Sequence, residues 1–169
     1  MSSFAERALR ALPPDLVTLR TPRAADQRAS VVELCRGALL SPVASPPLDR
    51  LAQGARRIAV IVSDESRDEP RSDMLRALRE VLPWDRVTLV VASGTHEASH
   101  RAVPDEHRDR PVVVHGSGST VVDLGRTTRG TRIRLLDVVA EADLVVATGR
   151  GRPHYFAGLP AGATAILPG

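Results

Sequence analysis

Three short segments of this 169-residue chain carry side chains that could bind an anion or move a proton. They are Ser63-Asp-Glu-Ser-Arg67, Ser93-Gly-Thr-His96 and Gly149-Arg-Gly-Arg-Pro-His154. The planar guanidinium of Arg67 suits a carboxylate or a phosphate, and the carboxylate of Asp64 could orient a base or hold a ribose hydroxyl. His96 and His154 are of the type that carries protons near neutral pH, so together they could serve both faces of one carbon atom.

Each of these residues also has a simpler structural interpretation. Asp64 could be a turn or helix-capping aspartate, Arg67 an exposed partner of neighbouring acids, and each histidine an ordinary surface residue. Their common position favours a functional role over the structural one, because each of the three segments directly follows a predicted buried strand.

The elements that would position these segments alternate along the chain. Unbroken β-branched runs predict buried strands at 57–63, 87–93, 111–115 and 143–148, and an alternating pattern predicts an edge strand at 131–135. Helices are predicted at 29–40, 72–82 and 137–142. Residues 1–30 are the least defined, with a candidate edge strand at 16–20.

This order of elements is typical of one α/β domain over residues 1–169. We expect a mainly parallel, Rossmann-like sheet with helices on both faces. Ligands bind such sheets at the carboxyl ends of the strands. We therefore expect Asp64, Arg67, His96 and His154 to line one shared site.

The composition excludes several function classes. All 23 basic residues are arginine, which rules out a Schiff-base lysine and a phosphate-binding loop that ends in Gly-Lys. The single cysteine, Cys35, rules out an internal disulfide and a multi-cysteine zinc site, and is predicted to be a small buried hydrophobe. It also favours a cytoplasmic location.

Nucleic acids and membranes are not expected partners. The pI of 10.3 reflects a small excess of arginine, and the arginines are interleaved with 20 acids. The chain has one Trp, one Tyr and two Phe, too few for a base-stacking surface. No apolar run approaches the roughly 18 residues that a membrane helix needs, and the first residues lack the pattern of a signal peptide.

The segment His96-Glu-Ala-Ser-His100 matches the H-E-x-x-H signature of helical zinc peptidases. On a helix, His96 and His100 would share one face and could bind zinc, with Glu97 as the base. The context argues against this interpretation, because the segment leaves a strand through Gly-Thr and Pro104 follows soon after. Otherwise His100 and His107 are expected to be solvated loop residues, and no metal ligand is assigned.

Taken in order, the segments resemble the nickel-dependent lactate racemase family. The resemblance includes Leu124-Gly-Arg-Thr-Thr-Arg-Gly-Thr131, Ala140-Glu-Ala-Asp-Leu144 and, above all, Gly149-Arg-Gly-Arg-Pro-His-Tyr-Phe-Ala-Gly158 through Ile166-Leu-Pro-Gly169. It implies the amino-terminal domain of a racemase or epimerase of small 2-hydroxy acids that uses a nickel-pincer nucleotide. In that chemistry the α-hydrogen leaves the substrate as a hydride to the cofactor, while a histidine removes the hydroxyl proton.

The resemblance also implies roles for individual residues. By motif match, His96 and His154 would be the two acid–base residues, Arg67 would bind the substrate carboxylate and Asp64 would order the site. Four further residues are expected to contact the substrate or the cofactor: Thr95, Tyr155, Gly158 and Gly162.

Two departures from the family pattern change these expectations. Thr164 stands where the family has the lysine that tethers the cofactor, and no lysine exists elsewhere in the chain to replace it. We therefore expect any nickel-pincer nucleotide to be bound non-covalently. The family also continues well past Leu-Pro-Gly, with a nickel-ligating histidine and a second domain that closes the cleft, so we expect a truncated domain that is incomplete without a second domain or polypeptide.

The sequence therefore leaves three functions open. The first is a racemase or epimerase of 2-hydroxy acids that resembles lactate racemase. The second is a non-catalytic α/β module that binds a nucleotide or another anion. The third is a zinc hydrolase that uses His96 and His100.

Overall fold

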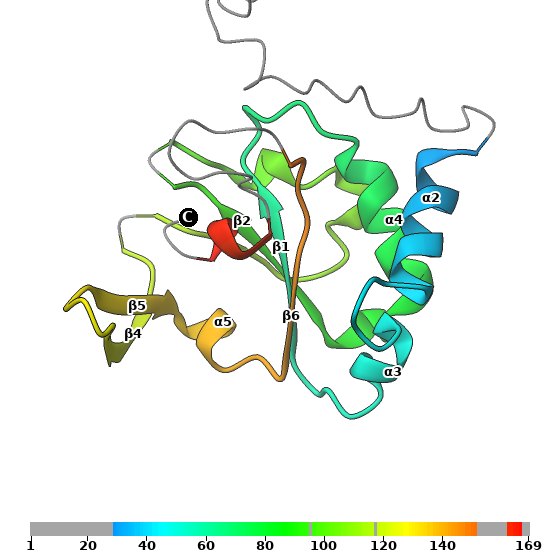
Figure 1. The fold of residues 1–169 in the computed structure, drawn as a ribbon. Helices are drawn as coiled ribbons and strands as arrows, with labels where there is room; N and C mark the ends of the chain where they lie inside the picture. The colour runs from blue at the N-terminus through cyan, green and yellow to red at the C-terminus, as the bar shows by residue number, and fades with distance from the viewer. Residues whose placement is uncertain (1–28, 95, 117, 152–161, 167–169) are drawn as a thin grey trace, which may run out of the picture.

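The centre of the fold is a parallel sheet of four strands in the order β3–β2–β1–β6 (Figure 1). In the computed structural model, residues 29–94, 96–116, 118–151 and 162–166 are described. Strand β1 (Ile58–Ser63) pairs in parallel with β2 (Val87–Ala92) on one side and β6 (Leu144–Ala147) on the other. Strand β3 (Val112–Val114) extends the sheet beyond β2, also in parallel.

Side chains of β1 alternate between two apolar layers. Ile58, Val60 and Val62 face one cluster, which also contains Leu75 and Leu78. The opposite cluster contains Ala59 and Ile61 of β1 together with Leu136 and Val139. A strand covered on both faces reads as a continuous apolar run, which is why the sequence of β1 does not alternate.

Helices cover both faces of the sheet. Figure 1 shows α2 (Val31–Leu40), α3 (Leu48–Ala52) and α4 (Arg71–Val81) together on one side. The short helix α5 (Asp137–Ala140) lies on the other side, where Ala165 and Ile166 also pack. The described residues also form four short 3₁₀ helices, which are η2 (Trp84–Arg86), η3 (His100–Ala102), η4 (Asp105–His107) and η5 (Gly162–Ala165).

Local sequence explains where α2 begins. The Ser30 hydroxyl accepts from the Glu33 backbone N–H at 3.2 Å, and the Glu33 carboxylate accepts from the Ser30 backbone N–H at 2.8 Å. This capping box satisfies two N–H groups that a helix start leaves unpaired.

None of the α2 residues is buried, so Cys35 is half-buried rather than the buried hydrophobe that the sequence predicted. The reason is that α2 packs on the outside of α4, away from the sheet.

A separate two-stranded antiparallel sheet precedes α5. It pairs β4 (Val121–Arg126) with β5 (Arg132–Leu136), and a register shift falls between Asp123 and Arg126. The predicted strand at 131–135 therefore exists but belongs to this hairpin, whose other strand the sequence did not predict. Figure 1 shows the hairpin projecting from the side of the sheet that carries α5.

The α/β class, the mainly parallel sheet and the helices on both faces are confirmed. The predicted strand at 16–20 lies outside the described residues. Helix α3 was not predicted, because its five residues are too few for a periodic apolar pattern. No helix in the described part of the chain has the length and apolar character that would let it cross a bilayer.

Candidate functional site

The carboxyl ends of β1, β2 and β6 meet at one edge of the sheet. These strands are neighbours and all parallel, so the segments that leave them start side by side. The backbone N–H of His96 donates to the Ser93 carbonyl at 2.9 Å, closing a turn directly after β2 that includes Gly94 at φ 55°. Glycine adopts this left-handed backbone without the clash that a Cβ would cause.

Asp64 is the centre of the described cluster. It directly follows β1 and is 3% exposed. Its Oδ1 accepts from the Ser66 backbone N–H at 2.9 Å and from the Ser66 hydroxyl. Its Oδ2 lies 3.3 Å from Nδ1 of His96 and 3.8 Å from Nε of Arg67. Thus one buried carboxylate holds a histidine and an arginine from two different segments.

The electrostatics of Asp64 favour its ionised form. Burial raises the pKa of this carboxyl, but the hydrogen bonds from Ser66 and from His96 outweigh burial and lower the pKa below its usual value. The carboxylate is therefore negatively charged at neutral pH. A buried negative charge attracts both neighbouring cationic or potentially cationic groups, His96 and Arg67.

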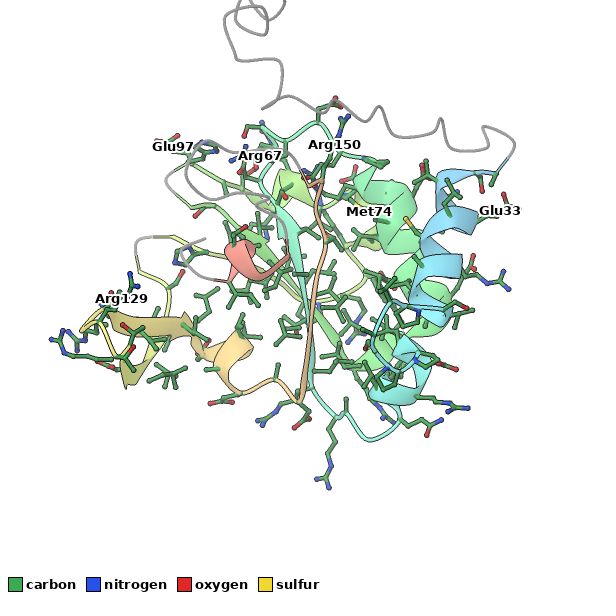
Figure 2. All side chains as sticks on the ribbon, viewed as in Figure 1. Glu33, Arg67, Met74, Glu97, Arg129 and Arg150 are labelled. Atoms are coloured by element: carbon green, nitrogen blue, oxygen red, sulfur yellow. The ribbon has the colours of Figure 1, made fainter. Side chains whose placement is uncertain are left out.

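The groups around Asp64 remain accessible to a ligand. The side chain of His96 is 44% exposed and that of Arg67 is 54% exposed. The two terminal nitrogens of Arg67 make no hydrogen bond with any residue in the described ranges, so its fork is available for an anion. Figure 2 shows Arg67 and Arg150 at the same end of the molecule.

Two further acids of the loop after β1 tie this loop to its neighbours, and the sequence analysis missed both. Glu65 accepts from the Ser99 hydroxyl at 2.7 Å and from the Ser99 backbone N–H at 3.3 Å, which anchors the segment after β2. Oε1 of Glu69 accepts from the Ser63 hydroxyl at 3.2 Å and from the Arg150 backbone N–H at 3.1 Å, which anchors the segment after β6. The only sequence signal was the density of acids between Asp64 and Pro70.

The backbone of this loop is also fixed from within. A terminal nitrogen of Arg71 donates to the Asp64 carbonyl at 2.8 Å, and the Arg67 backbone N–H donates to the same carbonyl at 3.2 Å. Close by, Gly149 has φ 151°, and a Cβ there would lie 3.8 Å from the Ser63 hydroxyl oxygen and 3.9 Å from Glu69. The segments after β1 and β6 therefore pass closely, with a glycine at the point of approach.

The structure unites part of the predicted site. It brings Asp64, Arg67 and His96 together, as the strand-end argument predicted. Gly162 and Thr164 lie in η5, which packs through Ala165 against the second face of the sheet. The other predicted site residues, Thr95, His154, Tyr155 and Gly158, lie outside the described residues.

The helical zinc motif does not have the geometry that it requires. Residues 96–99 form a bend and an irregular loop, and His100 only begins the 3₁₀ helix η3, so His96 and His100 do not share the face of an α-helix. The hydrogen bonds between Ser99 and Glu65 hold this loop away from a helical path. Across the described ranges, no group of three or more histidine, cysteine, aspartate or glutamate side chains could hold a metal ion.

His107 was expected to be a solvated loop residue, and this expectation was wrong. The side chain is 3% exposed, packs edge-on against Trp84 at 6.2 Å between ring centres, and its Nε2 donates to the Ser72 carbonyl at 3.2 Å. Its Nδ1 is buried and has no hydrogen-bond partner among the residues that the structure describes. His100, in contrast, is exposed as expected.

Comparison with known proteins places the chain among its relatives. The fold is that of an α/β domain whose parallel sheet carries a carboxylate, a guanidinium and an imidazole at its carboxyl edge. The profile of the lactate racemase N-terminal domain matches residues 6–169, so the chain belongs to this family.

The chain is 32% identical to the lactate racemase of Lactiplantibacillus plantarum, with 84% of this chain and 36% of that protein covered. It is 30% identical to the lactate racemase of Thermoanaerobacterium thermosaccharolyticum, with 81% of this chain and 35% of that protein covered. The structure of the lactate racemase apoprotein from the latter organism superposes with a TM-score of 0.72 at 28% identity, covering 82% of this chain and 36% of that one. The chain thus spans a little over a third of the length of these relatives.

Proposed function

We propose that this chain is the acid–base and carboxylate-binding domain of a racemase or epimerase of small 2-hydroxy acids such as lactate. One observation carries the proposal: Asp64 contacts both the imidazole of His96 and the guanidinium of Arg67 at the carboxyl edge of the sheet. Such a substrate has a carboxylate next to a carbon that bears a hydroxyl. The fork of Arg67 matches the carboxylate, and His96 matches the hydroxyl.

In the proposed reaction the residues of this chain bind and move protons. Arg67 orients the substrate through its carboxylate, which fixes the neighbouring carbon relative to His96. His96 accepts the hydroxyl proton as the carbonyl forms and returns it when the hydroxyl is restored. His154 is proposed to do the same on the opposite face, and Thr95, Tyr155, Gly158 and Gly162 to contact the substrate or the cofactor.

The proposed cofactor is a nickel-pincer nucleotide. When bound, this group would supply a reversible acceptor for the α-hydrogen of the substrate as a hydride. The exposed guanidinium group of Arg150 fits the phosphate of a nucleotide. A lysine tether does not fit, because Thr164 is a half-buried residue of η5 and the chain contains no lysine. Non-covalent binding is therefore part of the proposal, as is a cytoplasmic location.

The test is interconversion of D- and L-lactate by the complete protein, with its cofactor and any second domain or polypeptide, purified from cells that make it and measured by chiral chromatography. We expect His96→Gln to lower the rate at least about 100-fold, since general acid–base groups typically contribute this much. His100→Gln is the matched control, because His100 is exposed and lies just beyond the site. Equal rates for the two variants, or no interconversion by the unmodified protein, would contradict the proposal.

The fork of Arg67, which makes no hydrogen bond within the described part of the chain, also supports the second candidate, a non-catalytic module that binds an anion. This alternative predicts that lactate or a phosphate compound binds and that Arg67→Ala abolishes the binding, without any interconversion. Titration calorimetry combined with the chiral assay separates the two functions.

A further inference from the structure

Ser66 stands between Asp64 and His96, and the proposed function gives it no role. Its hydroxyl oxygen lies in very close contact with Oδ1 of Asp64 and 3.3 Å from Nδ1 of His96. Its backbone N–H donates to the same Oδ1 at 2.9 Å. The three side chains thus form a closed ring of contacts, because Oδ2 of Asp64 also lies 3.3 Å from Nδ1 of His96.

The number of protons on these three side chains determines which group donates each hydrogen bond. A serine hydroxyl has one proton, and an ionised carboxylate has none. The close contact between the two oxygens requires that proton, so the hydroxyl of Ser66 donates to Asp64. The oxygen of Ser66 then presents a lone pair to Nδ1 of His96.

Both oxygens that face Nδ1 of His96 are therefore acceptors. A hydrogen on Nδ1 satisfies both of them, whereas a bare Nδ1 would place three lone pairs against one another. A neutral imidazole carries one N–H, so Nε2 is then bare and able to accept a proton. Histidine free in water favours the opposite tautomer, with the hydrogen on Nε2.

We propose that Ser66 is a positioning residue that, with Asp64, holds His96 in the Nδ1–H tautomer and leaves Nε2 as the base. Ser66 occupies Oδ1 of Asp64 through two hydrogen bonds, and so turns Oδ2 toward the imidazole. When Nε2 takes up a proton, the imidazolium donates from Nδ1 to the same two oxygens. That Nε2 takes the proton of a 2-hydroxy acid rests on the proposed function, whereas the tautomer does not.

The test is the tautomer of His96 in the ¹⁵N-labelled 169-residue chain, read from long-range ¹H–¹⁵N correlation of the imidazole rings above the pH at which they are protonated. His96→Gln identifies the signals. We expect the unmodified protein to show a protonated Nδ1 and a bare Nε2 on His96. We expect Ser66→Ala to lower the ratio of the Nδ1–H to the Nε2–H form at least about threefold, and Ser66→Thr, which keeps the hydroxyl, to preserve it.

Ser72→Ala is the matched control, because its hydroxyl also binds a carboxylate, that of Glu106, away from His96. It should leave the His96 signals unchanged. Hydrogen on Nε2 of His96 in the unmodified protein overturns the proposal, even if Ser66→Ala fails to fold. An unchanged ratio of the Nδ1–H to the Nε2–H form in a folded Ser66→Ala protein also overturns it. The measurement needs no turnover, so a protein with the expected tautomer but no lactate interconversion would contradict only the proposed function.

Discussion

At the scale of single residues, Asp64 combines burial with charge. Its carboxylate is almost fully covered, yet the hydrogen bonds from Ser66 and His96 hold it in the ionised form, and Nε of Arg67 lies 3.8 Å away. A buried charge is tolerated only when its hydrogen-bonding capacity is met. The position of Asp64 directly after β1 lets a residue at the end of the core contact both Arg67 in its own loop and His96 in the segment after β2.

Asp64 should make the stability of the chain depend on pH in the acid range. Because its pKa is lowered in the folded state, its contribution is fully present above the unfolded-state value of about 3.9 and is lost as the pH falls through the lower folded-state value. Removing that charge with Asp64→Asn should weaken this dependence. It should also destabilise the protein by about 1–3 kcal/mol at neutral pH, since Ser66 and His96 would face a mismatched partner.

Urea unfolding of both proteins between pH 2.5 and pH 7 measures this effect. Asp49→Asn is a suitable control, because Asp49 is exposed and bonds only the next backbone N–H among the described residues. If the unmodified protein and Asp64→Asn lose stability in parallel as the pH falls, Asp64 is not the group responsible.

At the scale of elements, the loop after β1 acts as the link between strands. Glu65 holds the segment after β2 and Glu69 holds the segment after β6, on either side of the central strand. The loop itself lies between two buried elements, because β1 ends just before it and α4 begins just after it. The position of the site therefore depends on how firmly α4 packs against the sheet.

Truncation of α4 at its buried face should destabilise the whole chain. Leu75 is fully buried between α4 and the sheet, so Leu75→Ala should reduce the free energy of unfolding by about 2–5 kcal/mol through lost burial and a cavity. Leu34→Ala is the matched change on α2, where the side chain is 49% exposed, and should reduce it by well under 2 kcal/mol. Urea denaturation of the two variants compares them; equal losses would show that α4 does not carry the core.

At the scale of the whole molecule, the site is open to water. His96 and Arg67 are each about half exposed, although transfer of a hydride requires a site from which water is excluded. The chain spans a little over a third of the length of the curated relatives that it matches. The proposed reaction therefore needs a cover that the described residues do not supply, which agrees with the expected second domain or polypeptide.

The absence of lysine leads to a prediction for the complete protein with its cofactor. A bound nickel-pincer nucleotide should leave when the protein unfolds, because Thr164 stands where the family has the tethering lysine and these 169 residues contain no other lysine to replace it. Intact mass spectrometry should give the mass of the unmodified polypeptide under denaturing conditions and a larger mass under native conditions. A nucleotide that stays attached to the unfolded chain would contradict non-covalent binding.

Much of the fold could be predicted because its signals are local. The β-branched runs that became β1 and β2 are buried, and β6 at the edge of the sheet is half-buried with apolar side chains packed on both faces, so each of the three strands has a continuous apolar signature. Strand β4 lacked such a signal, because its last four residues are exposed and include Asp123, Gly125 and Arg126. Its pairing with β5 is decided by contacts across the turn rather than by the residues of β4 alone.

The sequence by itself determined which residue types leave the sheet at its carboxyl edge, and so placed Asp64, Arg67 and His96 near one another. It also determined that these 169 residues offer no lysine as a cofactor tether. Only the tertiary structure decided that Ser66 joins Asp64 to His96, that Glu65 and Glu69 anchor the neighbouring segments, and that His107 is buried. Parallel strands bring their ends to the same edge whatever follows them, whereas a hydrogen bond depends on distances of a few tenths of an ångström between residues that are as many as 81 positions apart.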